Sequence, residues 1–379
     1  MEFSYSREQQ MVKKMLKEFA ENEIEPISAE IDEKAEYPYE TVAKLGELGV
    51  MGMPFPQEYG GAGTDYLTYI MAIEEISKVD ASHGVIVQTH NALCCWPIFT
   101  YGTEEQKRKY LPDLLSGKKL GAFGLTEPNA GTDAAGTQTK ATDAGDHWVL
   151  NGSKIFISGG GIADVYVIFA MTDKSKGTHG ISAFIVEKGT PGFTSPKHEN
   201  KMGIRGSIAA ELVFEDCCIP KENLLGQTGK GFKIAMSALD VGRLGIAAQA
   251  LGIAQGAFDK TVEYMKQRKQ FGKTLDKFQA LAFEMAEMRT KIDGSRYLLY
   301  DACNRRDRGL PSTVAAAEAK LACSTTAMYV TEKAVQFHGG YGYIKDYPVE
   351  RMMRDAKITE IYEGTSEVMK MVMGGEIFK

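Results

Sequence analysis

Residues 148–158 read WVLNGSKIFIS, and the alternation of apolar and polar side chains in this stretch is typical of β-structure. The Asn151-Gly152 pair in its middle tolerates the positive φ angles of a tight turn, so the stretch predicts a β-hairpin that turns at these two residues. Three downstream segments continue the period of two, namely 164–171 (DVYVIFAM), 180–189 (GISAFIVEKG) and 209–216 (AAELVFED). Residues from about 121 to 229 are therefore predicted to form a sheet or barrel.

Helical spacing precedes this β module, over residues 1 to about 120. Ser6 and Gln9 have the spacing of a capping box, in which a hydroxyl and an amide satisfy the free N–H groups of a first helical turn. Apolar residues then recur at helical spacing, and we predict that Pro26 ends this helix because proline lacks an N–H donor.

The same capping device recurs at Thr103 and Gln106, and the helix that it opens is predicted to end at Pro112. Between these helices, residues 54–65 (PFPQEYGGAGTD) are rich in glycine and proline. They predict a loop.

Helical spacing returns after the β module. The segment that begins at Lys230 (KGFKIAMSALDVGRLGIAAQALGIAQGAFDKTVEYMKQR) contains many small residues, which let helices approach closely. The order is therefore helical, β, helical, with domains expected at 1–120, 121–229 and 230–379.

Composition is that of an ordinary soluble globular protein, since 44% of the 379 residues are hydrophobic and 25% are charged. The formal net charge is -6 and no long basic run occurs, so we expect no nucleic-acid surface. No window approaches 18 uninterrupted apolar residues, so we expect no membrane insertion. The opening MEFSYSREQQ lacks the profile of a signal peptide, and a cytoplasmic location is expected. The six cysteines form no CxxC pattern and are expected to be reduced thiols. No two histidines are paired at i, i+4, so no metal is expected.

Two nucleotide-binding signatures are absent. Gly272-Lys273-Thr274 resembles the end of a Walker A loop, but Gln267 stands where that loop requires glycine. No GxGxxG motif follows a strand and opens a helix, so a Rossmann site is not supported.

Three segments carry polar groups in settings that suit a ligand. Residues 122–136 (AFGLTEPNAGTDAAG) place hydroxyls and backbone N–H groups among glycines, although a plain polar loop reads the same way. Residues 154–161 (KIFISGGG) end a strand with an aromatic ring and a hydroxyl, and a bare strand end fits equally well. Residues 355–368 (DAKITEIYEGTSEV) place Glu363 beside Gly364, ahead of a Thr/Ser pair that can cap a helix, where an exposed acid is the simpler reading.

Five segments together resemble the acyl-CoA dehydrogenase family over essentially the whole chain: 123–133 (FGLTEPNAGTD), 151–158 (NGSKIFIS), 267–273 (QRKQFGK), 336–343 (QFHGGYGY) and 354–367 (RDAKITEIYEGTSE). Their order and spacing agree with the helical, β, helical layout. Within the family, the chain looks most like the short-chain (butyryl-CoA) dehydrogenases of anaerobic bacteria.

The resemblance implies an α+β fold with an N-terminal helical domain, a middle β-barrel or sandwich domain and a C-terminal four-helix bundle. It also implies FAD between the β domain and the bundle, in a homotetramer built as a dimer of dimers. One FAD site would then draw on two chains, so the resemblance predicts that FAD binding requires assembly.

The residues that match the family's cofactor positions fall into four groups. The resemblance implies that the first group contacts the flavin ring, with Ser158 near N5, and that the second contacts the FAD of a neighbouring subunit. The third is expected at the adenosine end of FAD, and the fourth at a further part of FAD. In that order the groups are Phe123, Leu125, Thr126, Gly131, Thr132, Phe156, Ile157 and Ser158; Arg268, Phe271 and Gln279; Gln336, Gly339 and Gly340; and Thr365 with Glu367.

Glu363 matches the family's catalytic base, which removes a proton from the carbon next to the thioester while the β-hydrogen moves as hydride to flavin N5. Some branches place the base instead in the segment that here reads LDVGR, but this chain has Gly242 there. Substrate contacts are expected from Thr132, Asp240, Arg243, Tyr362 and Gly364, although Arg243 fits a structural ion pair equally well.

The resemblance therefore implies an FAD-dependent short-chain acyl-CoA dehydrogenase that makes a trans-2-enoyl-CoA and exchanges electrons with electron-transferring flavoprotein. An enoyl-CoA reductase that works on a short or substituted enoyl-CoA uses the same site in reverse and stays open. An acyl-CoA oxidase is less favoured, because typical oxidases carry an additional C-terminal region. A non-catalytic flavin- or acyl-CoA-binding protein is the alternative from a different class.

Overall fold

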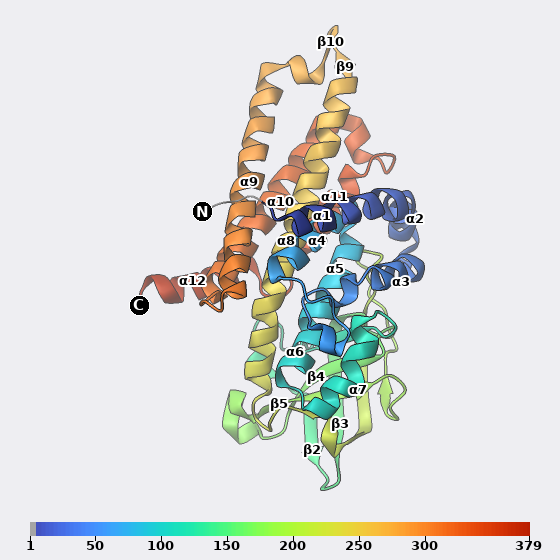
Figure 1. Cartoon of the computed structure of the whole chain (residues 1–379), viewed down its shortest axis with the longest axis vertical. Helices are drawn as coiled ribbons and strands as arrows, with labels where there is room; N and C mark the ends of the chain where they lie inside the picture. The colour runs from blue at the N-terminus through green and yellow to red at the C-terminus, as the bar shows by residue number, and fades with distance from the viewer. Residues whose placement is uncertain (1–4) are drawn as a thin grey trace.

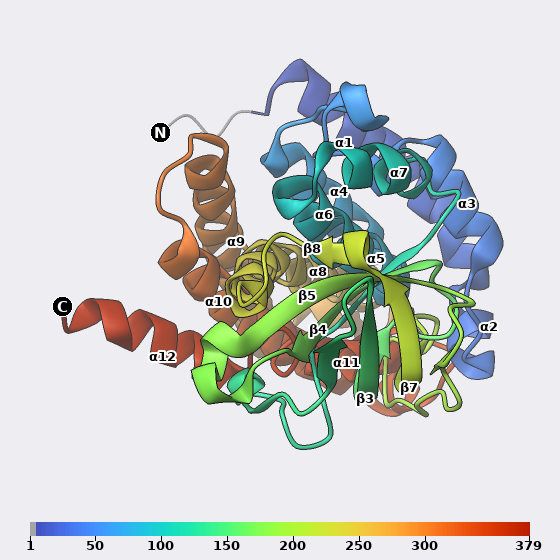
Figure 2. The same cartoon turned by 90° about the horizontal axis from the view of Figure 1, so that it is seen from below.

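A computed structural model describes residues 5–379 of the chain. A long helix, α8 (Gly231–Gln267), runs along the molecule, with the sheet at one end and the β9–β10 ribbon at the other (Figure 1). Seen along α8, the N-terminal helices, the sheet and the pair α9 and α10 surround it (Figure 2). The α+β class with its helical, sheet and helical parts is confirmed.

The N-terminal part consists of helices and short helical turns up to Leu115. They are α1 (Arg7–Phe19), a π-helical turn (Ala20–Ile24), α2 (Glu25–Lys34), α3 (Tyr39–Glu47), two 3-10 turns (Val50–Gly52 and Gln57–Tyr59), α4 (Tyr66–Ser77), α5 (Ala81–Thr89), a second π-helical turn (His90–Cys95), α6 (Trp96–Tyr101) and α7 (Glu104–Leu115). Between residues 54 and 65 only one 3-10 turn forms, as the glycine and proline content predicts.

Both predicted capping boxes are present. The Gln9 N–H donates to Ser6 Oγ at 3.1 Å, and the Ser6 N–H donates to the Gln9 side chain at 3.0 Å. The same reciprocal pair joins Thr103 and Gln106, at 3.2 and 3.0 Å. These bonds satisfy N–H groups that a helix start would otherwise leave free.

Both predicted helix ends at proline are wrong. Pro26 lies in the first turn of α2, which follows α1 through the π-helical turn Ala20–Ile24, and a proline at this place removes no helical hydrogen bond. Pro112 lies inside α7, which continues to Leu115. The helix continues for three residues beyond Pro112, although the proline cannot donate to the carbonyl four residues earlier.

The middle part is one mixed sheet in the order β6-β7-β3-β2-β4-β5-β8, with β1 parallel to β4. Its strands are β1 (Gly121–Gly124), β2 (Lys140–Asp143), β3 (His147–Ser158), β4 (Val165–Met171), β5 (Ile181–Glu187), β6 (Phe193–Thr194), β7 (Ala209–Pro220) and β8 (Leu224–Leu225). Each segment predicted from the period of two downstream of the proposed hairpin contains one of β4, β5 and β7.

The predicted hairpin turn at Asn151-Gly152 is wrong, because both residues lie inside the single long strand β3. The pairing of β3 with β7 shifts register between Leu150 and Gly152, and the Asn151 side chain bonds to Asp216 of β7. Gly152 has φ +141, and a Cβ on it would lie 2.7 Å from the Cα of Thr139. The dipeptide therefore builds a β-bulge that lets β2 approach closely, rather than a turn.

The C-terminal part is helical around α8. It contains the ribbon β9 (Lys269–Gln270) and β10 (Lys273–Thr274), a 3-10 turn (Leu275–Lys277), α9 (Gln279–Asp307), α10 (Thr313–His338), a second 3-10 turn (Gly339–Tyr343), α11 (Val349–Ile358) and α12 (Ser366–Ile377). In Figures 1 and 2, α12 projects away from the body of the molecule.

Small residues of α8 allow close helix contacts, as the sequence predicts. A Cβ on Gly252 or Gly256 would lie 2.4 Å from the Glu74 carbonyl oxygen or 2.0 Å from that of Lys78. Helix α8 is long and apolar enough to cross a membrane, but 78% of its apolar window is buried inside the protein, so it is a core helix. All six cysteines are free thiols, of which only Cys218 is exposed.

Candidate active site

Glu363 lies in the short connection between α11 and α12, and its backbone is strained. Its φ is +52, in the left-handed region that residues other than glycine seldom occupy, and Gly364 follows at φ +102. The Thr365 side chain accepts a hydrogen bond from the Val368 N–H at 3.3 Å and caps α12, as predicted. Strain that persists in a well-supported loop is a feature of functional sites.

The Glu363 carboxylate points into the interior, toward α5 and α8. Its Oε2 accepts a hydrogen bond from Gln88 Nε2 at 3.3 Å, and Oε1 is buried without a hydrogen-bond partner. Burial raises the pKa of Glu363 to about 7, against the opposing pull of Lys320, Gln88 and Arg243. A carboxylate with a pKa near neutrality is suited to accept a proton at physiological pH.

Gly242 of α8 forms one wall beside the carboxylate. A Cβ at this position would lie 1.9 Å from Glu363 Oε2 and 3.1 Å from Leu93 Cδ2. The Gln88 amide also donates to the Gly242 carbonyl at 3.2 Å, so one side chain links the acid to the helix. The space occupied by the carboxylate therefore depends on the glycine.

Tyr362 points to a different partner. Its hydroxyl donates to the side-chain oxygen of Gln249 in α8, which occupies its donor inside the protein. Any contact of Tyr362 with substrate would therefore involve its ring rather than a donated hydrogen bond.

Asp240 and Arg243 form an ion pair on α8, at 2.6 Å. The Thr313 hydroxyl donates to the second oxygen of Asp240 at 3.0 Å, while Arg243 Nε is buried without a partner. The ion pair that the sequence allowed for Arg243 is therefore present. Because Arg243 Nε is still free to donate, the predicted contact with a ligand stays a prediction.

The glycine-rich loop that follows β1 is held by a buried ion pair that the sequence did not reveal. Lys154 Nζ lies 2.7 Å from Glu127 Oε1 and donates to the Leu125 carbonyl at 3.2 Å. The Glu127 carboxylate also accepts the N–H groups of Gln138 and Thr139, at 2.6 and 2.9 Å. The only signal in the sequence is a lysine at a position of β3 that alternation would make apolar.

The end of β3 presents an exposed aromatic ring. Phe156 is 63% exposed with φ +61, at a second register shift between Lys154 and Ile157. Ile157 is buried and Ser158 half-buried, and β1 brings Phe123 and the half-buried Thr126 to the same sheet. An exposed aromatic ring on strained backbone is a feature of ligand-binding sites. Gly131 and Thr132 are exposed in the loop.

The other predicted cofactor residues gather at the opposite end of α8. A hollow of about 530 Å³ is lined by Arg268, Gln336, Gly339 and Gly340, and the Arg268 guanidinium lies 5.4 Å from the centre of the Tyr341 ring. On the adjoining ribbon and helix, Phe271 is 94% exposed and Gln279 is exposed.

These two groups of residues belong to different parts of the chain. The ring-side residues belong to the sheet, whereas the Arg268 group lies at the C-terminal end of α8, and the sheet and the β9–β10 ribbon lie at opposite ends of the molecule (Figure 1). Thr365 and the exposed Glu367 lie beside the base instead. The structure therefore brings the ring-side residues together and the Arg268 group together, but not with each other.

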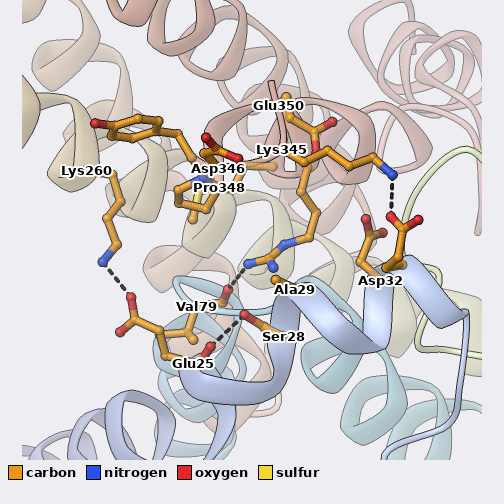
Figure 3. Close-up of a pocket in the computed structure, with 14 residues that line it drawn as sticks. Glu25, Ser28, Ala29, Asp32, Val79, Lys260, Lys345, Asp346, Pro348 and Glu350 are labelled. Carbon is orange, nitrogen blue, oxygen red and sulfur yellow. Dashed lines mark hydrogen bonds and ion pairs between the residues drawn. The ribbon is translucent and has the colours of Figure 1, made fainter. Parts of the chain in front are cut away.

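A separate pocket of about 200 Å³ lies between α2 and residues 345–352 (Figure 3). Its charges are largely satisfied within the protein, since Glu25 pairs with Lys260 at 2.6 Å and Glu33 pairs with Lys345. None of the predicted site residues lines it. Within residues 5–379, no cluster of three or more metal-ligating side chains occurs.

The chain as a whole matches known proteins. Three family descriptions match in order: "Acyl-CoA dehydrogenase, N-terminal domain" over residues 6–118, "Acyl-CoA dehydrogenase, middle domain" over 122–217 and "Acyl-CoA dehydrogenase, C-terminal domain" over 229–378. The chain belongs to the acyl-CoA dehydrogenase family. It is therefore a flavin-dependent oxidoreductase, and the resemblance read from the sequence is confirmed.

Individual relatives are similar over their full length. The short-chain specific acyl-CoA dehydrogenase of Clostridium acetobutylicum is 62% identical over 100% of both chains. The structure of butyryl-CoA dehydrogenase from Megasphaera elsdenii aligns with a TM-score of 0.98 at 54% identity over 100% of both chains. A structure described for the electron transferring flavoprotein of Acidaminococcus fermentans and flavin-based electron bifurcation contains a chain that aligns with a TM-score of 0.99 at 55% identity, again over 100% of both chains.

Proposed function

We propose that this acyl-CoA dehydrogenase oxidises short-chain acyl-CoA thioesters, with Glu363 as the base and FAD as the cofactor. The observation that carries the proposal is the buried carboxylate of Glu363, whose pKa burial raises to about 7. The short-chain relatives in anaerobic bacteria support the size of the acyl group. We propose domains at 1–120, 121–229 and 230–379.

In the proposed reaction, Glu363 accepts the proton from the carbon next to the thioester carbonyl. Burial of the carboxylate keeps it less solvated than an exposed acid and therefore a stronger base toward a carbon acid. Gly364 follows the base at φ +102, and a Cβ on it would lie 2.7 Å from Met369 Cε, so glycine lets the connection that carries the base pack against α12. Negative charge that develops on the thioester oxygen needs hydrogen-bond donors, and the Glu363 N–H is the proposed protein donor.

The residues around Phe156 fit the flavin ring, as their exposure and strain indicate. When bound, FAD supplies the oxidant that takes the β-hydrogen with its two electrons, so that the substrate becomes a trans-2-enoyl-CoA. We assign ring contacts to Thr126, Phe156 and Ser158, and contacts with a neighbouring subunit's FAD to Arg268 and Phe271.

The proposed FAD contacts also imply that the protein forms an oligomer. Because the sheet and the ribbon lie at opposite ends of the molecule (Figure 1), we propose that a complete site draws on two chains, in the homotetramer expected for the family. The electron partner that we propose is electron-transferring flavoprotein, supported by the structural relative from Acidaminococcus fermentans. We propose a cytoplasmic location.

The test is the bleaching of the purified flavoprotein by butyryl-CoA under anaerobic conditions. We expect rapid loss of flavin absorbance in the unmodified enzyme, and retained flavin with almost no bleaching in Glu363→Gln, because the amide cannot accept the proton. Substantial bleaching in that variant would refute the assignment of the base. No bleaching in the unmodified enzyme would instead favour a non-catalytic flavin-binding protein.

The reverse reaction, reduction of a short or substituted enoyl-CoA, uses the same residues by microscopic reversibility. In that direction protonated Glu363 returns the proton to the α-carbon. Steady-state rates in both directions, measured with an electron-transferring flavoprotein as partner, separate a dehydrogenase from a reductase. Bleaching followed by rapid recovery of colour in oxygen would indicate an oxidase.

A further inference from the structure

Lys320 is a buried lysine that points at the segment carrying Glu363. It lies in α10 and is 1% exposed. Its Nζ donates to the Gly364 carbonyl oxygen at 2.6 Å and to the Thr359 carbonyl oxygen at 3.1 Å. Both of these acceptors are backbone carbonyls rather than carboxylates, so Lys320 is a buried cation that holds main chain.

The two carbonyls lie on either side of Glu363 in the sequence. Thr359 is the residue at which α11 ends, and Gly364 is the residue directly after the base. A cation at a helix C-terminus satisfies free carbonyls and the negative end of the helix dipole. One side chain therefore ties together the start and the end of the connection that carries the base.

The backbone of this connection adopts a conformation that needs support from the surrounding structure. Glu363 at φ +52 adopts a backbone conformation that costs of the order of 1 kcal/mol or more in a free chain. The Ser366 N–H bonds to the Glu360 carbonyl at 3.0 Å, and this bond also closes the connection. The Lys320 bonds cross from another helix and fix the position of the connection relative to α10.

The ammonium also contributes charge. The charged groups around Lys320 are Glu363, Glu360 and Arg243. Burial lowers the pKa of Lys320 to about 8, and the negative charge of Glu363 is the largest effect that raises this pKa. Around Glu363 the titratable and polar groups are Lys320, Gln88 and Arg243, together with the hydroxyls of Tyr66, Tyr69 and Tyr362. A positive charge close to the base favours its ionised, proton-accepting form.

We propose that Lys320 is a positioning residue for the base, which holds the connection at residues 359–364 and keeps Glu363 ionised and in place. This inference rests on the proposed function of Glu363. Lys320 takes no part in proton transfer itself, because its donors are directed at the main chain.

Three variants separate position from charge. Lys320→Met keeps most of the length of the side chain but removes both the charge and the donors. Lys320→Gln removes the charge and keeps a donor, and Lys320→Arg keeps both in a larger group. The matched control is Lys333→Met in the same helix, since Lys333 pairs with Glu284 at 3.3 Å away from the base connection.

The measurement is the second-order rate constant for flavin bleaching by butyryl-CoA, from about pH 6 to pH 9. In Lys320→Met we expect retained flavin, a rate at the optimum that is about 100-fold lower, and an acidic limb shifted upward by about one pH unit. The sign follows because loss of a nearby cation makes the carboxylate harder to ionise. Lys320→Gln should recover part of the rate but keep the shifted limb, whereas Lys320→Arg should restore the limb.

A role in folding alone predicts a different pattern: lower thermal stability and lower flavin content, with the acidic limb unmoved in the flavin-containing fraction. An unmoved limb together with a rate within about threefold of the unmodified enzyme would overturn the inference. Should Lys320→Met fail to yield flavoprotein, the limb of Lys320→Gln decides in the same way. Bleaching by Glu363→Gln would refute the proposed base itself, so the two failures are distinguishable.

Discussion

We expect that replacement of Gly242 by alanine will displace the carboxylate of Glu363, the proposed base, without disturbing the fold. The added Cβ would lie 1.9 Å from Glu363 Oε2 and 3.1 Å from Leu93 Cδ2, and both of these atoms end flexible side chains. Side-chain rotation relieves the clash, so the backbone of α8 stays in place. Alanine is also a better helix former than glycine by about 1 kcal/mol, and thermal stability should not fall.

The loss in activity follows from the displacement. Ordinary contact with a Cβ begins near 3.4 Å, so the carboxylate oxygen must move by about 1.5 Å from its place 1.9 Å away. A misplacement of about 1 Å in a catalytic group costs roughly 100-fold in rate. We therefore expect the bleaching rate of Gly242→Ala to fall by at least about 100-fold, which corresponds to about 2.7 kcal/mol of activation free energy.

The assay is stopped-flow bleaching by butyryl-CoA, accompanied by flavin content and thermal melting. Gly294→Ala is the matched control, because Gly294 lies in α9 and a Cβ added there would meet no atom within 4 Å. The control should bleach at the normal rate. If Gly242→Ala bleached within about threefold of the unmodified enzyme while folding normally, Glu363 would not need the place that this structure gives it.

Two further predictions concern Glu363 and Arg268. Burial raises the pKa of Glu363 to about 7, so the folded state keeps a proton that the unfolded state releases at lower pH. The ionised carboxylate therefore lowers the free energy of unfolding as pH rises through 7. Glu363→Gln should therefore unfold at a higher denaturant concentration than the unmodified enzyme above pH 8, with the difference fading toward pH 4.5; an equal difference at both ends would contradict this. Arg268→Ala should lose FAD or dissociate in size-exclusion chromatography with flavin detection, and a fully flavinated, normally assembled variant would count against a cofactor site shared between chains.

Sequence periodicity predicted the strands that are buried on both faces, and local chemistry predicted the helix starts. In β4 and β5 nearly every residue is buried, and glycine or charge marks both ends. The capping boxes were correct because each involves residues only three positions apart. Such signals depend only on residues close together in the sequence, so they can be recognised without the fold.

The errors arose where a distant strand or an adjoining π-helical turn changed the meaning of a local signal. Asn151-Gly152 has the chemistry of a turn, but Asp216 of β7 bonds Asn151 and the backbone of Thr139 packs against Gly152. Pro26 would end an isolated helix, yet the preceding π-helical turn places it where no N–H is needed. The contacts of Asn151 and Gly152 involve residues distant in the sequence, whereas the π-helical turn that precedes Pro26 lies next to it and was not predicted.

The family motif predicted Glu363 as the base and the segment of Gly242 as the place where some relatives carry it, but the contacts of Glu363 were not predicted. Gln88 lies 275 positions away from Glu363 in the sequence, and Gly242 and Lys320 come from two other helices. A carboxylate acquires a raised pKa only where these elements meet and remove water from it. The residue type therefore marked a candidate, while the fold supplied its chemistry.

In the assembly proposed above, one FAD site draws on two chains, so we expect assembly and cofactor binding to form one coupled equilibrium. Phe271 is 94% exposed at the ribbon and Phe378 is 90% exposed beyond α12, at places that project from the single chain (Figure 1). Burying each such side chain against a neighbour contributes about 1.5–3 kcal/mol. A cofactor that bridges Arg268 of one chain and Phe156 of another adds its own binding free energy only to the assembled form. Removal of FAD should therefore weaken the oligomer, and dilution of the oligomer should release FAD.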